Sequence, residues 1–295
     1  MIITIDIGGT AIKTGFMQDG KLTTLAQYPT DPKRENFSML ATLDNILDDI
    51  LVQYPEADGV ALSSAGVIDH QQGRVAFANE NIPGYKGTEL AAHIEATYHL
   101  PCSVDNDVNC ALMGELSLPR YQSVDSALMF TIGTGVGGAV YLNGDLYRGP
   151  TFSAGEVGYS IINGQPIERV ASTTALVAYV KERVDETVRD DVDGKWIFAQ
   201  AKDGHAICQE GIEWLVHHLT THIVNTVSLL NPEVVILGGG IMEQVDYLRP
   251  LIDAKFKELY QNTLVLRQTE IAFAQLGNRA GMIGAYEVFK TKHLA

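Results

Sequence analysis

The strongest pattern in the chain is an apolar run that breaks at small residues and then resumes, and this pattern occurs twice. From Met1 to Met17 the break falls at Gly8 and Gly9. From Leu128 to Leu142 an apolar run again meets a Gly- and Thr-rich turn and continues beyond it. Each stretch predicts two β-strands joined by a tight turn. Because one copy lies in each half, the chain is predicted to be a duplication.

Apolar spacing predicts the remaining elements. Apolar residues at helical spacing indicate helices at 36–54, 88–98, 108–118, 173–189, 207–230 and 244–260, with a last helix ending near residue 290. Short apolar runs bounded by turns indicate strands at 22–28, 59–62, 101–104, 232–241 and 264–274. Strands that alternate with helices are typical of the α/β class.

Length and duplication together predict two domains. A chain of 295 residues can form two domains of ordinary size, each with its own core. We expect an N-terminal α/β domain made of residues 1–117 and 279–295, and a C-terminal α/β domain made of residues 118–278. The final helix is thus expected to return to the first domain.

Composition narrows the possible partners. The formal net charge of −15 argues against a nucleic-acid partner, because the phosphate backbone would be repelled. Cys102, Cys110 and Cys208 are too few and too scattered for a disulfide framework or a CxxC zinc site, which suits a reducing compartment. No signal-like leader and no membrane-spanning apolar stretch are evident. We therefore expect a soluble, cytoplasmic protein that binds neither nucleic acid nor membrane.

The glycines of the first turn suggest phosphate binding. Without Cβ atoms at Gly8 and Gly9, backbone N–H groups and the Thr10 hydroxyl can face phosphate oxygens. Asp6, at the end of the first strand, can hold hydrated Mg2+. An ordinary hairpin turn is the alternative for either copy alone. The second copy, in which Thr131 aligns with Asp6, favours a pair of hairpins that grip one nucleotide.

The sequence argues against a dinucleotide-binding fold at the second hairpin. Gly133, Gly135 and Gly138 match the GxGxxG pattern. That fold requires a helix directly after the glycines, whereas residues 139–142 are β-like and lead into a turn at Asn143.

Two polar clusters follow predicted strands and are candidates for substrate chemistry. Asp105, Asn106 and Asp107 open the helix at 108–118, either as a simple helix cap or as a site in which an aspartate deprotonates an attacking hydroxyl. The small residues from Ser63 to Gly66 form either a ligand-binding strand end or a tight turn. The polar loop 79–87 offers amides that can bind sugar hydroxyls.

Later segments add two acids and a glycine cluster. Glu156 and Glu168 flank a turn, and either one can be solvated surface, although Glu156 lies between glycines. Gly238, Gly239 and Gly240 end a buried strand, where they form either an adenine or ribose pocket or a strand-to-helix turn.

These stretches together resemble the ROK family of sugar kinases over nearly the whole chain. The motifs are DIGGTAIKTG at Asp6, VDNDVNCALMGE at Val104, TIGTGVGGAV at Thr131, AGEVGY at Ala154, ILGGGI at Ile236 and LGNRAGMIGA at Leu276. The resemblance implies the duplicated two-domain fold of actin and hexokinase (ribonuclease H-like) with an interdomain cleft. It also implies an ATP- and Mg2+-dependent transfer of the γ-phosphoryl group to a sugar hydroxyl, that on C6.

The resemblance assigns roles residue by residue. Asp107 becomes the catalytic base, Asn106 holds the sugar, and Glu156 and Glu168 bind sugar hydroxyls. The full substrate-binding set that we expect is Ala65, Gly66, Asn81, Asn106, Asp107, Glu156, Tyr159 and Glu168. The expected nucleotide-binding set is Asp6 (through hydrated Mg2+), Gly8, Gly9, Thr10, Lys13, Thr131, Gly133, Thr134, Gly135, Gly137, Gly238, Gly239 and Gly240.

The chain departs from the family at the zinc motif. Tyr159 occupies the position of the usual histidine, and the segment between Gly164 and Glu168 contains no cysteine. We therefore expect no zinc site. Because that histidine also touches the sugar in the family, Tyr159 puts glucose specificity in doubt. The Gly-Glu-x-Gly-Tyr pattern resembles β-glucoside kinases, so glycosides are expected alongside glucose-type hexoses.

Other functions within the family remain open. One is a kinase for another hexose, such as N-acetylmannosamine. Another is a noncatalytic sugar-binding or regulatory protein, which the intact Asp107 argues against. Repressors of the family carry a winged helix-turn-helix before the kinase part, and we expect none here, because the sequence starts inside the first hairpin. The expected partners are a small-molecule sugar, ATP and a second copy of the chain in a homodimer.

Overall fold

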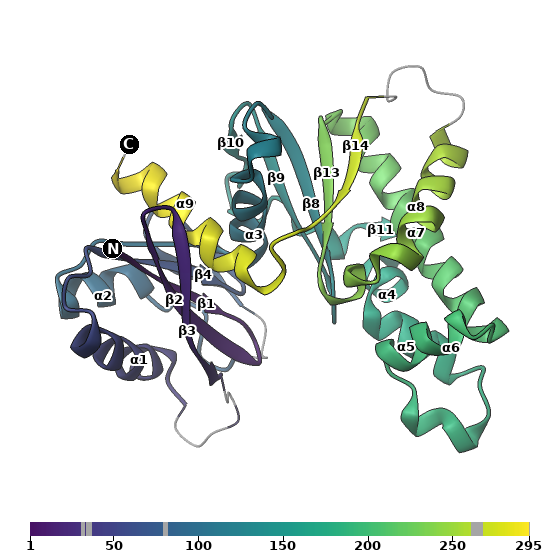
Figure 1. Cartoon of the computed structure of the whole chain (residues 1–295), viewed down its shortest axis with the longest axis horizontal. Helices are drawn as coiled ribbons and strands as arrows, with labels where there is room; N and C mark the ends of the chain where they lie inside the picture. The colour runs from purple at the N-terminus through teal and green to yellow at the C-terminus, as the bar shows by residue number, and fades with distance from the viewer. Residues whose placement is uncertain (31–32, 34–36, 79–81, 261–267, 295) are drawn as a thin grey trace. The chain divides into compact units, whose positions relative to one another are not determined.

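The computed structural model describes the chain except for residues 31–32, 34–36, 79–81, 261–267 and 295 (Figure 1). The described residues form two compact units. Unit 1 contains Met1–Ser123, Arg148–Ala154 and Leu276–Ala295, and unit 2 contains Val124–Tyr147 and Gly155–Gln275. The segment Arg148–Ala154 therefore packs with unit 1, whereas the sequence-based boundaries placed it in the second domain. No helix in the described part of the chain is long and apolar enough to cross a membrane.

Unit 1 is built around a five-stranded sheet with the order β3-β2-β1-β4-β7. Its strands are β1 (Ile2–Ile7), β2 (Ala11–Gln18), β3 (Lys21–Pro29), β4 (Gly59–Ser64) and β7 (Cys102–Asn106), with a separate pair β5 (Val67–Asp69) and β6 (Arg74–Phe77). Its helices are α1 (Met39–Gln53), α2 (Leu90–Tyr98), α3 (Asp107–Leu116) and α9 (Ala280–His293). The antiparallel pairing of β1 with β2 confirms the first predicted hairpin.

Strand alternation explains why helices cover both faces of this sheet. Ile3, Ile5 and Ile7 share a buried cluster with residues of α1 and α2. Ile2 belongs instead to a smaller cluster with Cys110 of α3 and Phe289 of α9. The final helix therefore completes the core of unit 1.

Unit 2 repeats the topology. Its sheet has the order β10-β9-β8-β13-β14, with β8 antiparallel to β9 and parallel to β13, as β1 is antiparallel to β2 and parallel to β4. The strands are β8 (Ser126–Ile132), β9 (Val136–Leu142), β10 (Asp145–Leu146), β13 (Val234–Gly238) and β14 (Glu270–Phe273), with a separate pair β11 (Ile161–Ile162) and β12 (Gln165–Pro166). The helices are α4 (Glu168–Ala171), α5 (Thr173–Lys181), α6 (Gly194–Lys202), α7 (Ala206–Leu230) and α8 (Val245–Tyr260). The shared order confirms the predicted duplication.

One predicted helix is shorter than its apolar pattern indicated. The helix expected at 173–189 ends at Lys181, and a separate 3-10 turn runs from Glu186 to Asp191. Asp185 accounts for the break, because its side chain caps that turn by accepting from the Thr187 N–H. The strand expected at 264–274 is observed only as β14, and residues 264–267 lie outside the described part of the chain.

Candidate active site

In unit 1, the turn between β1 and β2 exposes backbone where the sequence predicted phosphate binding. The Gly8 N–H donates to the Ala11 carbonyl at 3.0 Å, and the Thr30 hydroxyl donates to the Gly8 carbonyl at 2.7 Å. These bonds fix the turn while Gly9 and Thr10 stay exposed. A Cβ atom added at Gly9 would meet nothing within 4 Å. The protein itself leaves this space open, so the turn can receive a ligand close to the backbone.

Asp6 lies beside this turn and is firmly oriented. Its Oδ1 accepts from the Ser63 hydroxyl at 2.6 Å, and its Oδ2 lies 3.3 Å from Lys13 Nζ. Lys13 Nζ also donates to Asn278 Oδ1 at 3.2 Å. A carboxylate oxygen is the kind of ligand that Mg2+ takes, directly or through one of its waters, so Asp6 fits a hydrated Mg2+ ion beside phosphate. Within the described residues no three His, Cys, Asp or Glu side chains gather as metal ligands.

The junction between β7 and α3 is the second part of the site in unit 1. Asn106 caps α3, because its Oδ1 accepts from the N–H groups of Val108 and Asn109 at 2.8 and 3.1 Å. Its Nδ2 donates to the Gly66 carbonyl at 2.9 Å, which joins the junction to the residues after β4. The stretch after β4 therefore forms a bend that also positions Asn106, and its reading as a ligand-binding strand end stays a prediction.

Asp107 is the first residue of α3 and is only half-buried. Its Oδ1 accepts from the Val108 N–H at 2.9 Å. Burial raises the pKa of the Tyr85 hydroxyl, the hydrogen bond with Ser64 lowers it, and the charge of Asp107 raises it. The net effect is a raised pKa. Burial and then the charges of Asp105, Asp6 and Asp107 also raise the pKa of the Cys110 thiol. The Asp6 carboxylate beside the turn and the Asp105 and Asp107 carboxylates of the junction therefore all lie near the buried Cys110 thiol.

Asp105 differs from Asp107 in its surroundings. Its side chain is 1% exposed and receives hydrogen bonds on both oxygens. Oδ1 accepts from the Asn106 N–H at 2.8 Å and from Asn109 Nδ2 at 2.9 Å. Oδ2 accepts from Nε and Nη2 of Arg148 at 2.8 and 2.6 Å. This buried, paired carboxylate suits a structural role, whereas the accessible Asp107 suits chemistry.

In unit 2, the second hairpin turn is held by the start of α5. The Gly133 carbonyl accepts from the Thr173 N–H at 2.8 Å, and the Thr134 carbonyl accepts from the Thr174 hydroxyl at 2.7 Å. With its carbonyls occupied, the turn is fixed in place. A Cβ atom at Gly133 would again meet nothing within 4 Å.

A cavity of about 620 Å³ opens beside this turn. Its apolar walls include Val177, Phe198 and Ile241, and its polar edge includes residues of the turn, of the start of α6 and of the β13–α8 loop. The lining residues are Gly133, Thr134, Thr173, Thr174, Val177, Asp193, Gly194, Lys195, Phe198, Gly240, Ile241, Glu243 and Gln244. A planar base between apolar walls and a ribose at a polar edge fit this lining.

The three consecutive glycines at the end of β13 differ in what an added Cβ atom would meet. At Gly239, φ is +92° and a Cβ atom would meet the backbone nitrogen of Ile132 at 2.6 Å, so only glycine fits. A Cβ atom added at Gly238 would lie 2.8 Å from the end of the Met129 side chain. Gly240 has no atom within 4 Å of its would-be Cβ and lines the cavity. Gly240 is thus the residue whose missing side chain leaves cavity space open.

Glu156 and Glu168 lie together in unit 2. Burial and then the charge of Glu168 raise the pKa of the Glu156 carboxyl. Glu168 begins α4, and its Oε2 lies 3.3 Å from the would-be Cβ of Gly135. Glu168 therefore adjoins the second hairpin. Tyr159 is 64% exposed, so its ring is accessible to a ligand.

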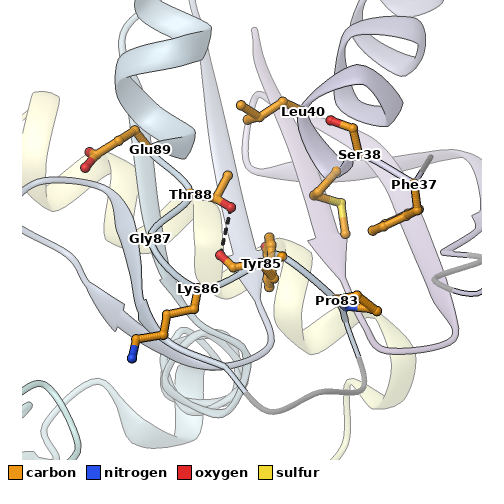
Figure 2. Close-up of a pocket in the computed structure, with 11 residues that line it drawn as sticks. Phe37, Ser38, Leu40, Pro83, Tyr85, Lys86, Gly87, Thr88 and Glu89 are labelled. Carbon is orange, nitrogen blue, oxygen red and sulfur yellow. Dashed lines mark hydrogen bonds between the residues drawn. The ribbon is translucent and has the colours of Figure 1, made fainter.

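A second cavity, of about 400 Å³, lies in unit 1 between the start of α1 and the loop before α2 (Figure 2). Phe37, Leu40 and Pro83 supply apolar surface, and Lys86 and Glu89 supply charge. Within the loop, the Thr88 hydroxyl donates to the Tyr85 carbonyl at 2.7 Å. Asn81, an expected sugar ligand, lies outside the described residues.

The structure groups the expected residues into two sets. Unit 1 brings together the first hairpin turn, Asp6, the Gly66 carbonyl and the β7–α3 junction. Unit 2 brings together the second hairpin turn, the glycines after β13, and the two glutamates. Sequence reasoning missed Arg148, Thr173, Thr174 and the apolar walls of the larger cavity, and it did not pair Ser63 with Asp6. Arg148 lies 43 positions from Asp105, and no spacing pattern relates them.

Comparisons with known proteins agree with this picture. The model of the ROK family matches residues 2–292. The β-glucoside kinase of Listeria monocytogenes is 30% identical over 291 residues, which cover 96% of this chain and 95% of that protein. A ROK family protein of Streptococcus pneumoniae, solved with sucrose, has a TM-score of 0.85 at 29% identity and covers 99% of both chains. A ROK glucokinase of Streptomyces griseus, solved with glucose and AMPPNP, has a TM-score of 0.81 at 26% identity and covers 97% of this chain and 98% of that one.

Fold and site together define a sugar kinase of the actin/hexokinase-like class. The duplicated sheet order and the two glycine turns carry that assignment. The chain belongs to the ROK family.

Proposed function

We propose that this protein transfers the γ-phosphoryl group of ATP to the C6 hydroxyl of a glucose-type hexose or a β-glucoside. The observation that carries the proposal is the β7–α3 junction. There Asp107 is half-buried, while Asp105 is buried and receives hydrogen bonds on both oxygens, and Asn106 donates one amide hydrogen to the Gly66 carbonyl. A carboxylate held in this way can accept the proton of an attacking hydroxyl.

The chain's other residues bind and orient the reactants in this proposal. Glu156 and Glu168 accept hydrogen bonds from sugar hydroxyls, and the second amide hydrogen of Asn106 donates to the sugar. The backbone N–H groups of the two hairpin turns and Lys13 contact phosphate oxygens. The larger cavity of unit 2 receives the adenosine part of ATP, which its apolar walls and polar edge support.

Asp6 fits a role toward Mg2+, through water. Its carboxylate oxygens and its place beside the first hairpin turn suit a hard cation that keeps most of its own waters. When bound with ATP, the ion neutralises charge on the β- and γ-phosphates. Asp6 itself is held for this task by Ser63 and Lys13.

The exposed ring of Tyr159 is the basis for the range of sugar acceptors that we propose. This ring can stack on the apolar face of a second sugar or an aglycone, which supports a glycoside as substrate. The name of the Listeria relative and the sucrose bound to the Streptococcus protein support the same class. Free glucose is kept in the proposal because the Streptomyces relative is a glucokinase.

An ATP-coupled assay tests the proposal. The purified protein, with Mg2+ and ATP, is offered glucose, methyl β-glucoside, cellobiose and N-acetylmannosamine. Turnover of glucose or a β-glucoside is expected, with the product phosphorylated at C6 by NMR. Turnover of N-acetylmannosamine alone would overturn the substrate assignment. Sugar binding with no turnover on any acceptor would point to a noncatalytic sugar-binding protein.

A further inference from the structure

We propose that Arg148 is a positioning residue for phosphoryl transfer. It acts through Asp105 on the β7–α3 junction, which carries Asp107. This inference rests on the proposed kinase function. The Arg148 side chain is 12% exposed, and its guanidinium donates to the buried Asp105.

The two oxygens of Asp105 accept hydrogen bonds from different partners. Oδ2 receives two N–H groups from Arg148, and Oδ1 receives the Asn106 N–H and Asn109 Nδ2. The guanidinium therefore fixes the carboxylate, and the carboxylate fixes the peptide that leads into Asp107. Asn106 then completes the junction by capping α3 and donating to Gly66. A shift of Asp105 would change the orientation of the next two residues.

Arg148 is itself anchored. It begins the segment Arg148–Ala154, which packs with unit 1 although both flanking stretches belong to unit 2. The Ala154 N–H donates to the Arg148 carbonyl at 3.1 Å, which closes the segment on itself. The ring of Phe152, at the tip of the segment, contacts His70 edge-on with 5.6 Å between centroids. Arg148 thus reaches Asp105 from a fixed point.

A lysine cannot replace this contact. The planar guanidinium presents Nε and Nη2 together to one carboxylate oxygen, whereas an ammonium group is a single point on a flexible stem. Arg148→Lys keeps the charge and loses the orientation. Arg148→Met loses both, and it leaves the buried Asp105 without its cation.

The kinetic test compares these variants on glucose or on the β-glucoside that the parent turns over. In Arg148→Met, kcat per folded protein is expected to fall roughly 10- to 100-fold, with the KM for ATP unchanged, because a displaced base loses alignment. Arg148→Lys should recover part of the loss. Arg74→Met is the control, since Arg74 forms a partly exposed pair with Asp69 in the same unit.

A double variant separates positioning from other roles. In an Asp105→Asn background, Arg148→Met should have little further effect on kcat if Arg148 acts through Asp105. Multiplied effects in the double variant, an unchanged kcat in Arg148→Met, or a change confined to the KM for sugar would each overturn the proposal. Should Arg148→Met fail to fold, Arg148→Lys carries the same comparison.

A measurement without turnover keeps this inference separate from the proposed function. Amide hydrogen exchange of the Val108 and Asn109 N–H groups, which Asn106 holds, is expected to be faster in Arg148→Met, with α7 unchanged. If the parent protein turns over no acceptor, the proposed function fails, and faster exchange at α3 still supports the positioning role. Unchanged exchange at these two amides would overturn it.

Discussion

Four acidic side chains of similar chemistry receive different tasks from their surroundings. Asp105 is buried and paired with Arg148, Asp6 is held by Ser63, and Asp107 is half-buried at the start of α3. Glu156, in the other unit, is partly desolvated next to a second glutamate. Accessible carboxylates can exchange protons with a substrate, and buried, paired ones cannot. This difference supports Asp107 as the base.

Replacing Asp107 with asparagine is expected to remove turnover and to preserve sugar binding. The amide keeps the size of the side chain and cannot accept the hydroxyl proton, so kcat should fall at least about 100-fold. Steady-state kinetics and calorimetric titration with the substrate sugar measure the two effects. Asp49→Asn, on the exposed side of α1, is the control. Near-parental kcat in Asp107→Asn would remove Asp107 from its role.

The raised pKa of Glu156 predicts a pH dependence of stability. The folded protein holds this proton more tightly than the unfolded chain, whose glutamate has a pKa of 4.5. The contribution of Glu156 to the free energy of unfolding therefore falls as pH rises from 4.5 through the raised pKa, and it recovers on acidification. Glu156→Gln should thus raise Tm at neutral pH, with the gain shrinking as pH falls through the raised pKa and smallest below pH 4.5.

The same substitution should weaken sugar binding. Losing a charged acceptor for sugar hydroxyls is expected to raise the KM for sugar roughly 10- to 100-fold. Thermal melts across pH and sugar titrations measure the two opposite effects. Glu182→Gln is the matched control, because the Glu182 side chain is 75% exposed. A lower Tm at neutral pH in Glu156→Gln would contradict the argument.

At the residue scale, the sequence was informative where a short motif carries its own meaning. The cluster around Asp107 was recognisable because two acids and two amides exceed what one helix cap needs. Arg148 carries no such signal, because its partner Asp105 is distant in the chain and meets it only in the folded protein. Ser63 was noted as part of a strand end, but its bond to the distant Asp6 could not be predicted. The roles of the site residues remain predictions.

At the scale of elements, α3 and α9 pack with their backbones in contact. A Cβ atom added at Gly284 of α9 would collide with the carbonyl of Cys110, and one at Gly114 of α3 would collide with the carbonyl of Ala280. These glycines let α9 approach the helix that begins at Asp107. A backbone carbonyl cannot move aside as a side chain can.

Gly284→Ala is therefore expected to destabilise the protein by about 2–3 kcal/mol, measured by urea unfolding. Gly211→Ala on α7 is a matched control, because the nearest atoms to the added methyl belong to side chains, those of Val180, Leu176 and Tyr179 at 3.0, 3.2 and 3.2 Å, and not to backbone. The better helix propensity of alanine offsets that contact, so its change should stay within about 1 kcal/mol. Equal effects of the two substitutions would contradict this account.

The loop after β13 allows a test of the nucleotide site. Gly240→Val adds a side chain at a residue that lines the cavity of unit 2 and whose added Cβ atom would meet nothing within 4 Å. The KM for ATP is expected to rise at least about 10-fold, with Tm and the KM for sugar little changed. An unchanged KM for ATP would exclude this cavity as the adenosine site.

Elements were predicted well where apolar periodicity was long and poorly where a cap interrupted it. The helix at 207–230 was nearly complete in the sequence pattern, and α7 runs from Ala206 to Leu230. The helix expected to residue 189 is shorter in the structure, because the Asp185 side chain caps a separate 3-10 turn. The apolar spacing continues beyond Asp185, so it did not reveal the end of the helix. Helix α6 was missed, although Asp193 caps it by accepting from the Trp196 N–H.

At the scale of the whole molecule, the repeated sheet order was predictable because both glycine turns were visible in the sequence. Sequence similarity between the halves then implied similar topology, and the two sheets agree. The short segment Arg148–Ala154 was not predictable in this way. Its place in unit 1 depends on the ion pair with Asp105 and the ring contact of Phe152, neither of which an apolar pattern records.

The return of the final helix predicts how truncation acts. A chain that ends at Gln275 loses the residues of α9 that pack against Ile2, Ala61 and Cys110. We expect unit 1 to lose its cooperative unfolding transition in this variant, while the transition of unit 2 remains, as measured by calorimetry. A chain lacking only residues 294–295 is the control, because Leu294 is 61% exposed. An intact pair of transitions in the long truncation would contradict the expectation.

The position of α9 also bears on biosynthesis. Unit 1 contains both residues that precede unit 2 in the chain and the stretch from Leu276 onward. The ribosome therefore completes every residue of unit 2 before it supplies the helix that closes the earlier unit. During that interval the newly made N-terminal sheet has one face without its covering helix, a face that chaperones recognise by its apolar side chains. Codon changes that slow translation just before Leu276 should lengthen this exposed period and lower the yield of folded protein.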